Sequence, residues 1–226
     1  MHVTIVAKAP VAGRVKTRLC PPCTFAEAAG VAAAGLADTF DAIDRIPGIE
    51  SVTRVLLLDG DAQPWMPGDY RVVPQRGDGL AERLRNGFAD LGPGVITGME
   101  TPHVAHLLGA ALDWLHRGVD VLGLAEDGGY WAIGLCATTI QRVDDVFAGV
   151  PMSTAVTGAV QHSRLRSVGT RLELLPYARD LDTIDDLRAV ADSGRSGRLA
   201  QLAREIVERS GQNPTDQPIV GSSVRA

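Results

Sequence analysis

Residues 3–19 read VTIVAKAPVAGRVKTRL, and this stretch decides how the rest of the chain is interpreted. Residues 3–7 are apolar and rich in β-branched side chains, which predicts a buried strand. The loop that follows carries four cations in residues 8–18: Lys8, Arg14, Lys16 and Arg18. Phosphate oxygens bind fixed positive charges and backbone N–H groups. The stretch therefore predicts a strand followed by a phosphate-binding loop, although a solvated basic loop would show the same pattern.

Further apolar runs predict strands at residues 52–59, 71–74, 94–100, 119–124, 130–135 and 172–175. Amphipathic segments between them predict helices that begin near Thr24, Asp78, Thr101 and Thr183, with a last helix at residues 198–209. This alternation predicts an α/β, Rossmann-like fold with a mostly parallel central sheet and helices on both faces. Residues 130–135 follow a Gly-Gly turn, so we expect that strand to be antiparallel or at the sheet edge.

The length of 226 residues predicts one nucleotide-binding domain over residues 1–209. Residues 210–226 are mostly small and polar, which predicts a disordered tail. A net charge of −5 argues against a dedicated nucleic-acid binder. The sequence shows neither a secretory signal nor a membrane span, and the odd count of three cysteines fits a reducing compartment. We therefore expect a cytoplasmic protein with no nucleic-acid or membrane partner.

Polar segments follow several predicted strands, and ligands of open parallel sheets lie at the carboxyl ends of the strands. Glu100 follows the fourth strand and could ligate a divalent cation, or simply favour the N-terminus of the next helix. Asp127 precedes two glycines, which allow a close backbone approach or a plain hairpin turn. Asp180 and Asp182 are one residue apart, so both could face a metal, or one could cap a helix. Cys20 and Cys23 have redox-motif spacing but do not open a helix after a strand, and no second pair supports a zinc site.

These segments, taken in order, resemble one bacterial family of GT-A-fold transferases. The matching segments are K-x-P-x-x-G-x-x-K-T-R-L at residues 8–19, GDGLAER at 77–83, EDGGY at 126–130, Ser153-Thr154, and D-x-D-T at 180–183. Many members are described as glycosyltransferases, and some are encoded beside radical-SAM genes. The loop is more distantly similar to that of molybdenum-cofactor guanylyltransferases and of F420 cytidylyltransferases.

The resemblance implies a nucleotide-diphospho-sugar transferase fold, a nucleotide-sugar or nucleoside triphosphate ligand, a small-molecule acceptor, and Mg²⁺ or Mn²⁺. The nucleotide and phosphate site is then expected at Lys8, Pro10, Gly13, Arg14, Lys16, Arg18, Asp78 and Arg83. The sugar and acceptor site is expected at Asp127, Gly128, Gly129, Ser153 and Thr154. Glu100 and Asp182 are the expected metal ligands, and Asp127 and Lys16 the expected catalytic residues.

The chain departs from the family at residues 98–102, which read Gly-Met-Glu-Thr-Pro. The family has an Asp at the position of Glu100 and a hydroxyl residue at the position of Met99. Met152 also replaces a tryptophan. We therefore expect a metal-dependent glycosyltransferase, and keep open a nucleotidylyltransferase that releases pyrophosphate and a nucleotide-binding protein without catalysis.

Overall fold

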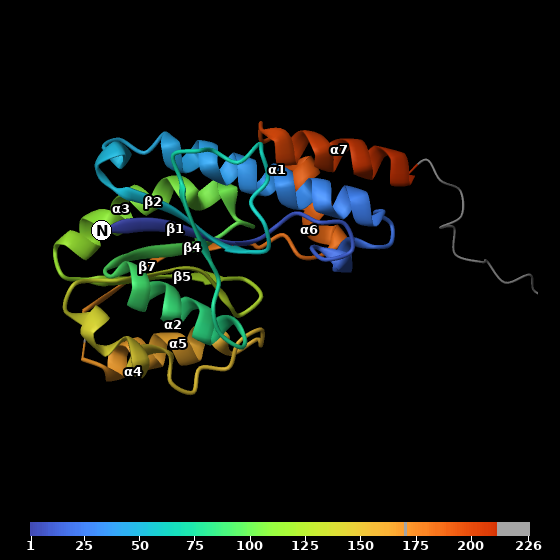
Figure 1. The fold of residues 1–226 in the computed structure, drawn as a ribbon. Helices are drawn as coiled ribbons and strands as arrows, with labels where there is room; N and C mark the ends of the chain where they lie inside the picture. Colours follow the sequence, from blue (N-terminus) through green and yellow to red (C-terminus); the bar gives the residue numbers. More distant parts are fainter. Residues whose placement is uncertain (170, 212–226) are drawn as a thin grey trace, which may run out of the picture.

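The computed structural model describes residues 1–169 and 171–211. Its centre is a seven-stranded sheet with the strand order β3-β2-β1-β4-β6-β5-β7 (Figure 1). The strands are β1 His2–Lys8, β2 Thr53–Asp59, β3 Arg71–Pro74, β4 Gly94–Gly98, β5 Asp120–Ala125, β6 Tyr130–Leu135 and β7 Leu172–Ala178. β6 is antiparallel to its neighbours β4 and β5, and every other pairing is parallel.

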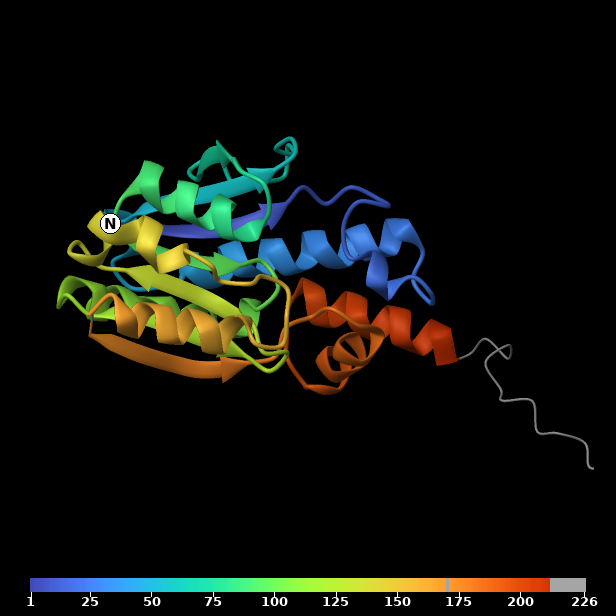
Figure 2. The same ribbon diagram turned by 90° about the horizontal axis from the view of Figure 1, so that it is seen from below.

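Helices cover both faces of the sheet (Figure 1). One face carries α1 and α3, with α7 packed outside α1, and the opposite face carries α2, α4 and α5. The bounds are α1 Phe25–Asp44, α2 Leu80–Leu91, α3 Leu108–His116, α4 Val143–Phe147, α5 Thr157–Ser167, α6 Ile184–Asp192 and α7 Arg198–Gly211. Figure 2 shows β2 and β3 at one edge of the sheet and β7 at the other.

The predicted α/β fold is confirmed, with a few local corrections. β6 is antiparallel as expected, but it lies inside the sheet, where β4 and β5 satisfy both of its edges. The capping boxes at Thr24 and Thr183 start α1 and α6. Asp78 does not cap α2, because Gly79 occupies the N-cap position. Thr101 precedes a 3₁₀ segment, η3 Pro102–Leu107, and α3 begins only at Leu108.

Three apolar clusters hold these layers together. The largest joins α1 and α3 to the sheet, and a second joins α2, α4 and α5 to the opposite face. The third lies beyond the strand ends, where α1, α6 and α7 pack together and enclose Leu19 and Cys23 of the N-terminal loop. This third cluster therefore anchors the basic loop to the C-terminal helices.

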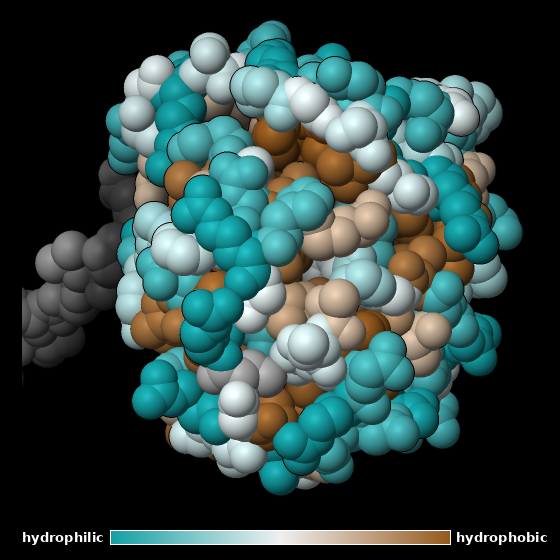
Figure 3. All heavy atoms as spheres, turned by 90° about the vertical axis from the view of Figure 1, so that its left-hand side faces the viewer, coloured by the Kyte–Doolittle hydropathy of each residue, from teal (hydrophilic) through white to brown (hydrophobic). Residues whose placement is uncertain are grey.

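The N-terminus lies at the end of the molecule where β1 begins, and α7 ends on the opposite side (Figure 1). Seen from that N-terminal end, the surface mixes hydrophobic and hydrophilic residues (Figure 3). No helix within the described residues is long and apolar enough to cross a membrane. The expected tail falls almost entirely outside the described residues, and the expectation of a single domain over residues 1–209 stays a prediction.

Leu19 gives a test of how the basic loop is anchored. Leu19 is 0% exposed, whereas Val11 of the same loop is 40% exposed. Leu19→Ala should lower the free energy of unfolding by about 2–5 kcal/mol, because a buried leucine loses its contacts and leaves a cavity. Val11→Ala is the control and should change it by less than about 0.5 kcal/mol. Urea denaturation measures both, and equal effects would contradict the anchoring role.

Candidate active site

The parallel strands all end at one edge of the sheet, and the antiparallel β6 begins there. Lys8 closes β1, Gly98 closes β4 and Ala178 closes β7, so the segments that follow them converge. Residues 126–129 connect β5 to β6 at the same edge. The topology therefore brings together polar segments that are more than 150 residues apart in the chain.

A cavity of about 760 Å³ lies at this edge, and we call it the Lys8 cavity. Most of the predicted site residues line it: Lys8, Arg14, Lys16, Arg18, Arg83, Glu100, Asp127, Ser153, Thr154 and Asp182. Five predicted residues do not line it: Pro10, Gly13, Asp78, Gly128 and Gly129. Pro10 and Gly13 shape the loop instead, because the Pro10 carbonyl accepts a hydrogen bond from Gln63 and Gly13 has a φ of +79°.

Lys16 is the centre of the polar network. Its ammonium forms ion pairs with Glu100 Oε1 and with Asp182 Oδ1 (3.0 Å), and it donates a hydrogen bond to the Leu181 carbonyl. Its side chain is only 5% exposed. Lys16 is therefore buried, because the loop folds inward onto the segment after β7. Arg18 is 75% exposed and reaches Asp182 Oδ2 at 3.2 Å.

Acidic side chains gather around this lysine. Burial raises the pKa of Glu100 even though Lys16 is beside it. Burial also raises the pKa of Asp180 to about 7, and the nearby carboxylates of Glu100 and Asp127 add to the increase. Asp180 Oδ1 is buried and has no hydrogen-bond partner in the described part of the chain. Three acidic side chains thus lie near one buried lysine, and burial favours the protonated forms of Glu100 and Asp180.

Basic side chains also line the cavity. Lys8 and Arg14 line it and form no ion pair with any acid in residues 1–169 or 171–211. Arg83 is held in place by Asp59 Oδ2 at 2.8 Å and by Gln75 Oε1 at 3.1 Å. Gln75 in turn donates to the carbonyls of β1 and β2. The cavity therefore offers an anionic ligand two unpaired cations, Lys8 and Arg14, and an arginine, Arg83, whose orientation is fixed.

The Asp127-Gly128-Gly129 turn differs from the expectation. The Asp127 carboxylate accepts a hydrogen bond from Gly129 N at 2.8 Å. A Cβ on Gly128, whose φ is +88°, would lie 2.1 Å from the Ala155 carbonyl oxygen. The space above Gly128 is therefore filled by the 153–155 segment, and neither glycine lines the cavity. Gly128 allows protein packing there, and the predicted close approach of a sugar to the Gly128-Gly129 backbone is wrong.

That packing places the 153–155 segment at the rim of the cavity. Gly158 N donates to the Gly128 carbonyl at 2.7 Å, which holds the start of α5 on the turn. Ser153 has a φ of +58°, and its side chain forms no hydrogen bond with another described residue. The Thr154 hydroxyl lies 3.2 Å from the Thr157 hydroxyl, so it stabilises the local turn. Of the two predicted residues, Ser153 is the one with a free hydroxyl at the cavity.

The polar residues that line the cavity outside the predicted site include Asp180, Gln75 and Thr101. Asp180 was considered with Asp182 but only Asp182 was assigned, and Gln75 and Thr101 were not assigned at all. Thr101 is 2% exposed, and its hydroxyl has no partner among the described residues. Gln75 and Thr101 come directly after the predicted strands at residues 71–74 and 94–100, and this position was the available signal for them. Asp180 comes five residues after the predicted strand at 172–175, and its signal was its spacing from Asp182.

Glu100 and Asp182 suit a divalent cation, because both carboxylates already converge on one positive charge, the Lys16 ammonium. The unpartnered Asp180 oxygen adds a third possible donor. No three acidic, histidine or cysteine side chains form a ready metal cluster within residues 1–169 and 171–211. Mg²⁺ is commonly held by one or two carboxylates together with phosphate oxygens of the substrate, so the residues fit a cation that binds with a phosphorylated ligand.

The family model described as "Uncharacterized protein conserved in bacteria (DUF2064)" matches residues 42–154, which is half of the chain. No curated protein shows significant similarity to the chain. Among solved structures, a protein from Desulfovibrio desulfuricans G20 provisionally named a nucleotide-diphospho-sugar transferase has a TM-score of 0.80 and 23% identity. The match covers 92% of this chain and 98% of that protein.

Two further structures are less similar. A cytidylyltransferase from Leptospira borgpetersenii has a TM-score of 0.52 and 13% identity, with 97% of this chain and 98% of that one covered. Rv0371c from Mycobacterium tuberculosis H37Rv has a TM-score of 0.51 and 19% identity, with 84% and 97% covered. The seven-stranded fold is thus that of nucleotide-diphospho-sugar transferases, as the sequence predicted.

Lys16→Met tests the central ion pairs through protein stability. It should lower the free energy of unfolding by about 1–3 kcal/mol, because two carboxylates lose their shared cation while remaining partly buried. Arg18→Met removes the same charge from an exposed pair and should cost less than about 1 kcal/mol. Urea denaturation measures the free energy of unfolding of both variants. Equal losses would show that Lys16 contributes no more than a surface cation.

Proposed function

This chain belongs to the bacterial family DUF2064, and we propose that it is a metal-dependent glycosyltransferase that uses a nucleotide-sugar donor. The observation that supports this most is the Lys8 cavity, where free cations and a converging set of carboxylates face each other at the strand ends. A nucleoside diphosphate carries the charge that such cations bind, and a hard dication is the partner that such carboxylates bind.

The diphosphate of the donor lies against Lys8, Arg14 and Arg18, with Arg83 oriented by Asp59 and Gln75. These cations stabilise the negative charge that develops on the diphosphate as it leaves. Lys16 contributes to the same stabilisation once the phosphates compete with Glu100 and Asp182 for its ammonium. The basic loop therefore serves both binding and departure of the leaving group.

In the transfer, the bond between the anomeric carbon and the diphosphate oxygen breaks, and a bond forms from that carbon to an acceptor hydroxyl oxygen. The electron pair of the broken bond stays on the diphosphate. Asp127, which lines the cavity and is held by Gly129 N, accepts the proton of the acceptor hydroxyl. Ser153 offers a free hydroxyl to the sugar.

Glu100 and Asp182 would hold the Mg²⁺ or Mn²⁺ ion. When bound, the ion neutralises charge on the phosphate oxygens. Met99 lines the cavity beside Glu100, but it is only 5% exposed and belongs to the core cluster that includes α1.

The cytidylyltransferase fold similarity supports a second candidate, a nucleotidylyltransferase on the same cavity. It would join a nucleoside monophosphate to a phosphorylated small molecule. The bond between the α- and β-phosphates of a triphosphate would break, and pyrophosphate would leave. The two candidates share the phosphate-binding cations and differ in their products.

The donor site is tested by thermal shift and calorimetry with a panel of nucleotide-sugars and nucleoside triphosphates, each with Mn²⁺. A ligand that binds only the folded protein raises the melting temperature. Arg83→Met should weaken the best ligand by about 1.5–3 kcal/mol, the usual contribution of a charge-assisted hydrogen bond. Arg166→Met is the control, since Arg166 is exposed on α5 and lines neither this cavity nor its neighbour.

The products then separate the candidates. A nucleoside diphosphate released from a nucleotide-sugar supports the glycosyltransferase, and pyrophosphate released from a triphosphate supports the nucleotidylyltransferase. Binding without either product supports a non-catalytic nucleotide-binding protein. Absence of binding by every nucleotide on the panel would refute all three.

Glu100 tests the metal assignment. Mn²⁺ should strengthen nucleotide binding in the wild type and much less in Glu100→Gln, because a neutral amide is a poor ligand for a hard dication. Glu100→Asp should keep the metal dependence, since it retains a carboxylate. Glu126→Gln removes the same charge from an exposed residue that does not line the cavity, and serves as the control. Calorimetric titration of the nucleotide at fixed Mn²⁺ compares all four proteins, and metal-independent binding in the wild type would contradict the assignment.

A further inference from the structure

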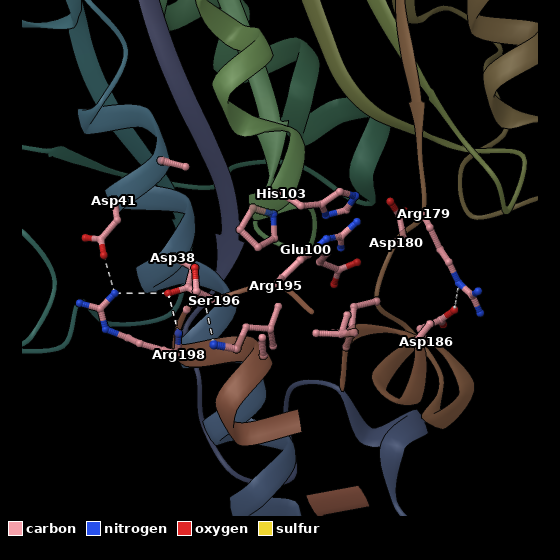
Figure 4. A pocket seen from close by; sticks show the side chains of 18 of the residues that line it. Asp38, Asp41, Glu100, His103, Arg179, Asp180, Asp186, Arg195, Ser196 and Arg198 are labelled. Carbon is pink, nitrogen blue, oxygen red and sulfur yellow. Dashed lines mark hydrogen bonds and ion pairs between the residues drawn. The ribbon is translucent and has the colours of Figure 1, made fainter. Parts of the chain in front are cut away.

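A second cavity, of about 730 Å³, lies beside the first, and we call it the Arg195 cavity (Figure 4). Its walls come from α1, from α6 and from the connection between α6 and α7. Glu100 and Asp180 line both cavities. A molecule in the Arg195 cavity would therefore reach the same carboxylates that face the Lys8 cavity.

The charges of the Arg195 cavity are paired with one exception among its arginines. Arg198 binds Asp38 and Asp41, Arg179 binds Asp186, and Arg45 lies 3.9 Å from Asp41. Arg195 has no side-chain hydrogen bond or ion pair with any residue that the structure describes. Of these four arginines, Arg195 is thus the one whose guanidinium has no partner among the described residues.

The Arg195 side chain extends inward, toward His103 and Glu100 (Figure 4). Its positive charge contributes to lowering the pKa of His103, to about 4, although burial of the imidazole is the larger cause. His103 is therefore neutral at pH 7 and does not supply a competing cation. It offers a ring nitrogen that can donate or accept a hydrogen bond.

The backbone around Arg195 is held while its side chain is not. Asp38 accepts hydrogen bonds from the backbone N–H groups of Arg198 and Leu199, which fixes the start of α7. A Cβ on Gly197 would lie 2.6 Å from Asp38 Oδ2, so this close approach requires glycine. The Arg195 carbonyl also accepts a hydrogen bond from Arg204. A fixed backbone with an unpaired guanidinium is an arrangement suited to capturing an anion.

Asp180 supplies the second unsatisfied group. Its Oδ1 atom is buried and lacks a hydrogen-bond partner among the described residues. Asp180 lines both cavities, so this atom lies in the wall between them. A carboxylate oxygen there can accept a hydrogen bond from a ligand hydroxyl. The cavity thus has an unpaired cation at one place and an unpaired acceptor at the boundary with the Lys8 cavity.

We propose that the Arg195 cavity binds the acceptor, a small hydroxylated molecule with an anionic group, phosphate or carboxylate. Arg195 binds the anionic group, His103 hydrogen-bonds beside it, and Asp180 accepts a hydrogen bond from a hydroxyl next to the one whose proton Asp127 takes. The acceptor role rests on the proposed transferase function, whereas the anion site itself does not. Arg195 is exposed and extends into this cavity, so an anion from the solvent can reach its guanidinium (Figure 4).

The test uses inorganic phosphate as the probe and follows the arginine side-chain Nε–Hε signals by ¹⁵N NMR. Arg195 should shift in a saturable manner, and signals of Arg14 and Arg83 report separately on the Lys8 cavity. Arg195→Met should weaken phosphate binding at the Arg195 cavity, followed there by the backbone amide of Ser196, about tenfold or more. Arg166→Met, which removes an equal charge outside both cavities, should leave it unchanged.

A second set of titrations identifies the ligand chemistry. sn-Glycerol 3-phosphate and glycerate compare the two anionic groups, and glycerol is the neutral control. Asp180→Ala should weaken the binding of sn-glycerol 3-phosphate more than the binding of inorganic phosphate. Inorganic phosphate has no carbon-bound hydroxyl that donates a hydrogen bond to Asp180.

Phosphate shifts confined to Arg14 and Arg83 would overturn the anion site, and equal shifts with glycerol would overturn its preference for anions. Equal weakening of both phosphates by Asp180→Ala would overturn the assigned hydroxyl contact. Nucleotide binding in Arg195→Met should match the wild type. If no nucleotide binds but phosphate still shifts Arg195, the transferase proposal and with it the acceptor role fail, while the anion site stands.

Discussion

The candidate site depends on the contact between the Lys16 ammonium and the carboxylates of Glu100 and Asp182. Glu100 follows β4, and Asp182 follows β7, so one lysine joins three distant parts of the chain. Leu19 places the loop for this contact, because it is buried among α1, α6 and α7. In the proposed function, a phosphorylated ligand competes for a cation that already has partners. Lys8 and Arg14, which form no ion pair among the described residues, would favour its binding.

The sequence predicted the elements of the fold well, because strand and helix periodicities are local properties of the chain. It could not predict the strand order, since pairing depends on residues far apart. The strand at residues 130–135 shows the limit. Its apolar run and the preceding Gly-Gly turn indicated an antiparallel strand, but nothing local revealed that it would insert between β4 and β5. Asp78 likewise had the right residue type for a helix cap, and Gly79 took the position instead.

For the candidate site, the sequence predicted that polar segments at these strand ends would converge, but not what each side chain would contact. Lys16 and Arg18 belong to one basic motif, yet one is buried in an ion-pair network and the other is largely exposed. Gly128 had two possible reasons to be glycine, and the Ala155 carbonyl above it is the actual one. That contact joins residues 27 positions apart, so only the folded chain can show it. Asp180 and Asp182 differ in the same way, because burial and neighbouring charge act on Asp180 through tertiary structure.

The replacement of the family's aspartate by Glu100 is consistent with the position of this residue between two cavities. Its carboxylate binds Lys16 on the side of the Lys8 cavity, and it also lines the Arg195 cavity. A glutamate carries one more methylene than an aspartate, so its carboxylate extends further from the backbone. Met99 beside it packs into the core, which fixes the backbone from which Glu100 extends. A change at this one position therefore alters the wall that both cavities share, and its effect on one ligand cannot be separated from its effect on the other.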